Sequence, residues 1–156
     1  MIRWIRAIVF FGLAALAFAS ETLDVLVTAA ASFSAAIERQ VEMLQSDPSP
    51  AEIVEKTFGY AEAKAAYFEA LRAELPELTK IATGKQARPP ELDTFAAAFA
   101  IAGEEQEKVA DQETLRLLKR FSLNPDVEKA MVKFDRAQKV EQAFHKDFDG
   151  LDFASR

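Results

Sequence analysis

The C-terminal end of the chain carries residue types that bind metal ions. His145 is the only histidine, Asp149 follows it at i+4, and Asp147 and Asp152 lie close by. Two of these aspartates match the third and fifth positions of a calcium-binding loop. The first position is His145 and the twelfth is Arg156, however, where such a loop has Asp and Glu. The pattern favours a polar helix end with an exposed histidine, and the weak metal candidates are His145, Asp147, Asp149 and Asp152.

Helical bundles that hold haem or two iron ions use other motifs, and these have little support here. A di-iron carboxylate site needs Glu-x-x-His on two helices, but the chain has one histidine and no such motif. Met43 and His145 fall at opposite poles of an up-down bundle and therefore cannot share one haem iron. Met131 and His145 share one helix, roughly 21 Å apart. We therefore expect neither a metal nor a cofactor.

Catalytic motifs are equally scarce. The chain contains no cysteine, and we find no Gly-x-Ser-x-Gly elbow and no Ser-x-x-Lys after the N-terminal segment. Glu104 and Glu107 could in principle do acid–base work. On a helix surface such pairs are usually solvated, whereas acid–base chemistry needs burial that shifts a pKa. We therefore expect a protein that is not an enzyme.

The N-terminal segment is the most specific part of the sequence. Two arginines precede an uncharged apolar stretch, and Ala17-Phe18-Ala19 places small residues where a signal peptidase reads them. The apolar stretch is shorter than the roughly 20 residues that cross a bilayer. Residues 1–19 are therefore predicted to be a secretory signal peptide, and residues 20–156 a single domain exported to the periplasm or the extracellular space. An uncleaved segment would instead make the chain a membrane-tethered adaptor.

Composition excludes several kinds of partner. The 156 residues include 25 acidic and 19 basic side chains, which gives a formal net charge of −6. Nucleic acids and anionic lipids reward a basic surface, so we expect no nucleic-acid partner, and membrane binding only if the signal segment is retained. Because there is no cysteine, the exported domain has no disulfide and must be held together by its core.

Apolar residues recur at steps of three and four along most of the chain, which indicates amphipathic helices. Prolines and capping residues separate these helices, as at Ser49-Pro50 and at Asn124-Pro125. The sequence therefore predicts an all-α fold, an antiparallel bundle of about four long helices. The expected helices span residues 21–45, 51–75 with a short extension after Pro76, 91–121, and 125–148.

The third of these segments is ambiguous. Gly103 and a polar block after it interrupt the apolar pattern of residues 91–121. One long helix with a soft point is the first choice. The alternative is a break near Ala110, with Asp111 as the N-cap of a separate helix.

The helix over residues 51–75 has a second apolar line that includes two tyrosines with a lysine between them. Tyr60, Lys64 and Tyr67 are candidates for an interaction surface with a protein partner, because tyrosine is amphipathic and common at interfaces. A place at the rim of the core is the alternative. The thirteen phenylalanines suit a filled core, but they could also line a cavity. Function is therefore predicted as non-catalytic binding, adaptor or scaffolding, with carriage of a small apolar ligand or cofactor in the core as the alternative.

Overall fold

The computed structural model describes the backbone of residues 2–148 and the side chains of residues 21–148 apart from 104–106. Within this part of the chain every regular element is a helix, so the predicted all-α class is confirmed. The six helices are α1 (Ile2–Leu44), α2 (Pro50–Ala73), α3 (Leu75–Ala82), α4 (Leu92–Ile101), α5 (Glu104–Arg120) and α6 (Pro125–Phe148).

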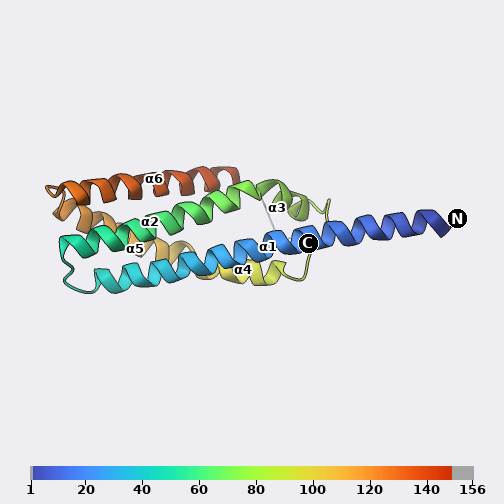
Figure 1. The fold of residues 1–156 in the computed structure, drawn as a ribbon, viewed down its shortest axis with the longest axis horizontal. Coiled ribbons are helices and arrows are strands. Elements are labelled where there is room, and N and C mark those ends of the chain that lie inside the picture. The colour runs from blue at the N-terminus through green and yellow to red at the C-terminus, as the bar shows by residue number, and fades with distance from the viewer. Residues whose placement is uncertain (1, 149–156) are drawn as a thin grey trace.

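The helices run side by side along the long axis of the molecule (Figure 1). Helix α2 is the central element, since it packs against both α1 and α6, while α4 and α5 follow one another along α1. The contact between α5 and α6 is slight. The N-terminal part of α1 extends beyond the other helices (Figure 1), and its backbone is helical from residue 2 onward. Cleavage after residue 19 stays a prediction.

Local signals that were visible in the sequence set the helix starts. Ser49 caps α2 in a capping box, in which the Ser49 backbone N–H donates to Glu52 at 2.9 Å and Pro50 begins the helix. At α6, the side-chain oxygen of Asn124 accepts a hydrogen bond from the backbone N–H of Asp126 at 2.9 Å. Both predicted helix starts are confirmed.

The end of α2 and the break between α4 and α5 depend on proline and glycine. Pro76 ends α2 and opens α3, and Gly84 follows α3 with a φ of 70°, as expected for a helix stop. At Gly103 an added Cβ would lie 2.5 Å from the carbonyl oxygen of Ala100, so this turn requires glycine. Helix α4 ends at Ile101, and α5 runs without a break from Glu104 to Arg120. The expectation of one helix over residues 91–121 is therefore wrong, and the alternative break near Ala110 is also wrong.

Aromatic side chains fill the space between α1, α2 and α6. The ring of Phe33 on α1 lies 5.2 Å from that of Tyr67, and Phe68 lies 5.5 Å from Phe144 on α6. All four residues are almost completely buried. Such ring pairs add to the stabilisation from apolar burial. Within the described part of the chain, no helix has the length and hydropathy that crossing a membrane requires.

Candidate functional site

A fully buried lysine lies between α2, α5 and α6. The Lys64 side chain has no solvent exposure, and its Nζ pairs with Glu107 at 2.9 Å, Asp111 at 2.5 Å and Glu141 at 2.5 Å. A buried ammonium without partners would be very costly, so these three carboxylates are what permits Lys64 to remain charged there. We call these four residues the Lys64 cluster.

Helix periodicity explains how the cluster forms. On α2 the buried line runs through Tyr60, Lys64 and Tyr67, so the lysine points into the bundle with the tyrosines. On α5 the buried side chains recur at helical spacing, at Glu107, Ala110, Thr114 and Leu118. Two of these four, Glu107 and Thr114, are polar. Helix α5 is therefore held to the bundle by polar as well as apolar contacts.

Hydrogen bonds and nearby charges keep Lys64 and Tyr60 protonated. The Tyr60 hydroxyl donates to Asp111 Oδ1 at 2.5 Å. Burial alone would lower the pKa of Lys64, but the three carboxylates outweigh that effect and raise it. Burial and the neighbouring Asp111 likewise raise the pKa of Tyr60. Both groups are thus protonated at neutral pH.

Glu107 and Glu141 differ in protonation because their surroundings differ. Burial and a hydrogen bond to Glu141 raise the pKa of Glu107 to about 9. Burial would also raise the pKa of Glu141, but hydrogen bonds from His145 and Glu107 and the charge of Lys64 together lower it to about 2. At neutral pH Glu107 is therefore a neutral acid that shares its proton with an ionised Glu141.

The three carboxylates form the kind of group that binds a cation. One oxygen from each of Glu107, Asp111 and Glu141 lies within 4.8 Å of the others. The Lys64 ammonium lies within ion-pair distance of all three. The positive charge that such a group needs therefore comes from the chain itself.

A second buried polar contact fixes α5 against α1 and α2. Gln40 on α1 is fully buried, and its Nε2 donates to Thr114 Oγ1 at 3.0 Å and to Thr57 Oγ1 at 3.3 Å. The amide therefore links three helices in the interior.

Replacing Thr114 with valine should destabilise the fold. Thr114→Val keeps the side-chain shape but removes the better of the two acceptors for the buried Gln40 amide, at an expected cost of about 1–2 kcal/mol. Urea denaturation at neutral pH measures this cost. The matched control is Thr28→Val on the exposed side of α1, where the hydroxyl bonds only its own helix and the change should stay within about 0.5 kcal/mol. Equal effects at the two threonines would contradict the role of the contact.

An open groove lies between α5 and α6, next to the Lys64 cluster. Its two parts have volumes of about 630 and 640 Å³ and share four lining residues, so they are continuous. One part is largely apolar, and the other is lined by the acids of the cluster, by neutral polar side chains and by Lys108 and Lys146. The shared residues are Asp111, Gln112, Gln138 and Gln142.

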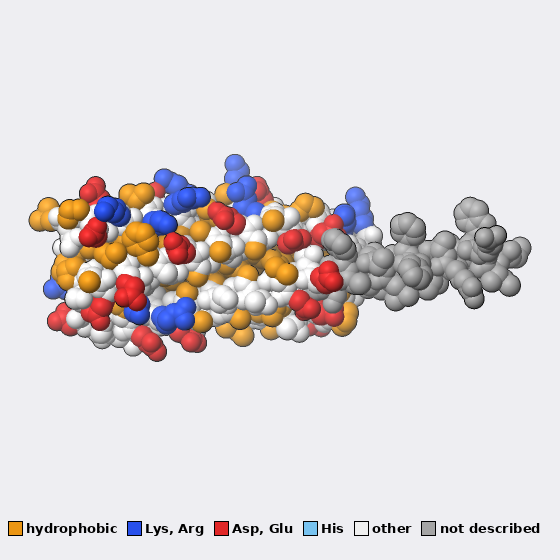
Figure 2. Space-filling view, viewed as in Figure 1, with side chains coloured by type: hydrophobic (Ala, Val, Ile, Leu, Met, Phe, Trp, Pro, Cys, Tyr) orange, Lys and Arg blue, Asp and Glu red, His pale blue; other side chains and the backbone are white. Residues whose placement is uncertain are grey.

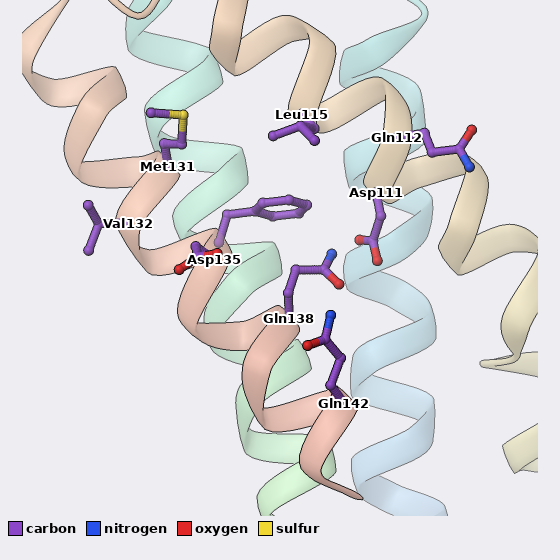
Figure 3. A pocket seen from close by; sticks show the side chains of 9 residues that line it. Asp111, Gln112, Leu115, Met131, Val132, Asp135, Gln138 and Gln142 are labelled. Atoms are coloured by element: carbon purple, nitrogen blue, oxygen red, sulfur yellow. The ribbon is translucent and has the colours of Figure 1, made fainter. Parts of the chain in front are cut away.

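Figure 3 shows how side chains from the two helices face this groove. Asp111 on α5 points toward Gln138 and Gln142 on α6, while Leu115 and Met131 lie toward the apolar part (Figure 3). Because Asp111 also contacts Lys64, the groove reaches the buried cluster. We call this surface the α5–α6 groove.

Comparison with protein families, with curated proteins and with solved structures found no match for this chain.

The candidate interaction residues of α2 lie in the interior. The sequence pattern placed Tyr60, Lys64 and Tyr67 at the edge of the apolar face, with the rim of the core as the alternative. The structure leaves them 1%, 0% and 2% exposed, so they form part of the core and do not present a surface to solvent. Their apolar bodies pack between the helices, and the polar ends of Tyr60 and Lys64 reach the carboxylates.

The weak metal candidates do not come together as a group in the described part of the chain. His145 is partly exposed and lies 3.5 Å from Glu141, whereas Asp147 is half exposed and pairs with Arg72 at 3.6 Å. Asp149 and Asp152 lie outside the described residues. His145 thus contributes to the edge of the Lys64 cluster.

The carboxylates of the cluster were missed at the sequence level. Glu107 was expected on a solvated helix surface, but it is only 4% exposed. The available signal was Lys64 itself, because a lysine on the apolar line of a helix requires buried acidic partners. Nothing local identified those partners, which are 43 to 77 residues further along the chain.

Proposed function

We propose that this chain is an exported, non-catalytic binding protein that acts as an adaptor or scaffold through the α5–α6 groove. In this proposal a signal segment precedes a bundle of four long units, in which α4 and α5 together take the place of one helix. The observation that carries the proposal is the open groove with its exposed apolar side chains. Clefts that combine apolar lining with a few polar groups are typical binding sites.

The chemistry of the Lys64 cluster favours binding over catalysis. Lys64 is kept protonated and is paired with three acids, so it does not offer the neutral amine that a nucleophile or base needs. The Tyr60 hydroxyl is committed to Asp111. In this reading the cluster holds α2, α5 and α6 together beside the groove.

The core packing favours a surface site over carriage of an apolar ligand in the bundle. Phe33, Tyr67, Phe68 and Phe144 already occupy the space between the helices. We therefore favour a partner protein that binds in the groove over a small ligand that is carried inside the core.

N-terminal sequencing of the exported protein checks the compartment, since a start at Ser20 supports export and an intact N-terminus supports the tethered alternative.

Site-specific photo-cross-linking in cells tests the proposed surface. A cross-linking amino acid at Gln138, inside the groove, should give a discrete adduct with a partner protein. The matched position is Glu55 on α2, which has a 75% exposed side chain and lines neither part of the groove. It should give no such adduct. Equal adducts at both positions, or none at Gln138, would contradict the proposal.

A further inference from the structure

The α5–α6 groove is long and open along the helix axes. Its lining on α6 extends from Met131 to Lys146, a rise of about 22 Å for an α-helix. A small molecule would cover only part of such a trough, whereas a helix of about four turns would match its length. Amphipathic helices commonly bind in grooves of this kind through apolar residues three and four positions apart.

Apolar side chains are exposed where such a helix would lie. Val132 is 65% exposed and Leu115 is 37% exposed, and Met131 lines the same part of the groove. Because α5 and α6 touch each other only slightly, their facing sides have room for side chains from a third helix. Charged side chains of both signs surround apolar ones on the face seen in Figure 2, so the surface as a whole is not apolar.

The charges that line the groove indicate which charge a partner helix should carry. Among the described residues, the apolar part of the groove is lined by two carboxylates and by no lysine or arginine, whereas Lys108 and Lys146 line the other part. Both oxygens of Asp111 are already engaged, by Tyr60 and Lys64. Asp135 is 62% exposed, and its ion-pair partner among the described residues is Lys139 of its own helix, at 2.7 Å. Such an exposed pair is weak, so a partner cation can replace Lys139.

We propose that the occupant of the α5–α6 groove is an amphipathic helix of a partner protein, about four turns long, with a lysine or arginine beside its apolar face. This inference rests on the proposed function and adds the chemistry of the partner. The apolar face covers Leu115, Met131 and Val132, and the cation pairs with Asp135. A second copy of this chain fits less well, because a two-fold contact through the groove would bring the same carboxylates together.

Two synthetic helical peptides of sixteen residues test this inference. Both carry the same leucine face, and their flanking positions are lysine in one and glutamate in the other. Fluorescence anisotropy with the full chain at low salt should show the lysine peptide binding at least about tenfold more tightly. Asp135→Asn should reduce that preference, and Val132→Glu should weaken binding of the lysine peptide by about tenfold or more.

The matched control is Val25→Glu on α1, at a valine with 59% exposure against 65% for Val132. It should leave the affinity unchanged. Equal loss in both valine variants, or equal affinity for both peptides, would overturn the inference. If neither peptide binds while cross-linking from Gln138 persists, the helical occupant is overturned and the proposed function stands. A dimer in light scattering that Val132→Glu dissociates would identify a second copy as the occupant and also overturn it.

Discussion

Replacing Lys64 with methionine is expected to lower the free energy of unfolding by about 3–5 kcal/mol at pH 7. Methionine retains much of the length of the lysine stem, so the loss comes chiefly from the missing ammonium. Without it, the ionised Glu141 lies in the interior with no cation beside it, and Asp111 and the neutral Glu107 lose the same partner. Chemical denaturation of Lys64→Met and wild type measures the difference.

Lys133→Met is the matched control, because Lys133 pairs with Glu62 at 3.2 Å but is about half exposed. Its cost should stay below about 1 kcal/mol. The double variant Lys64→Met, Glu141→Gln should be less unstable than Lys64→Met alone, since it removes the ionised acid that has lost its cation. A loss below about 1 kcal/mol for Lys64→Met would show that the Lys64 cluster does not hold the helices together.

Glu107 is expected to make the protein less stable as the pH rises from about 5 to 9. Its pKa is raised from 4.5 to about 9 in the folded state, so the folded protein binds more protons than the unfolded chain across this window. The contribution of Glu107 is therefore fully present below about pH 4.5 and falls by up to about 1.4 kcal/mol per pH unit above it. Denaturation curves at intervals between pH 5 and 9 measure the slope.

Glu107→Gln mimics the protonated acid and should flatten this slope. At pH 8 the variant should be more stable than wild type by up to about 5 kcal/mol. Glu141 has the opposite sign, because its pKa is lowered to about 2, and its contribution is lost as the pH falls from about 4.5 to 2. Glu141→Gln is therefore the comparison variant and should destabilise the fold at pH 8. The same slope in Glu107→Gln and wild type would contradict the shared proton.

Local signals made the helices predictable. Ser49 and Pro50 begin α2, and Asn124 and Pro125 begin α6, because capping and proline geometry depend only on neighbouring residues. The break at Gly103 was seen only as a soft point. The need for glycine there comes from the close approach of the Ala100 carbonyl, and this distance is not evident from residue types.

The Lys64 cluster required information that a single sequence does not contain. The position of Lys64 on an apolar line was visible, but its acidic partners come from two other helices. Which face of α5 turns inward depends on its packing against α1, and that orientation buries Glu107 together with Ala110 and Leu118. The polar segment after Gly103, which its residue types predict to be solvated, therefore contains a buried acid, Glu107.

Side-chain amide signals in nuclear magnetic resonance spectra give the most direct test of the central claim, that the α5–α6 groove is the binding surface. Gln112, Gln138 and Gln142 line the groove, whereas Gln40 is buried between α1, α2 and α5. When the lysine peptide is titrated into the ¹⁵N-labelled chain, we expect the amide signals of the three groove glutamines to shift together while that of Gln40 stays in place. Shifts confined to another face, or spread evenly over the molecule, would contradict that claim.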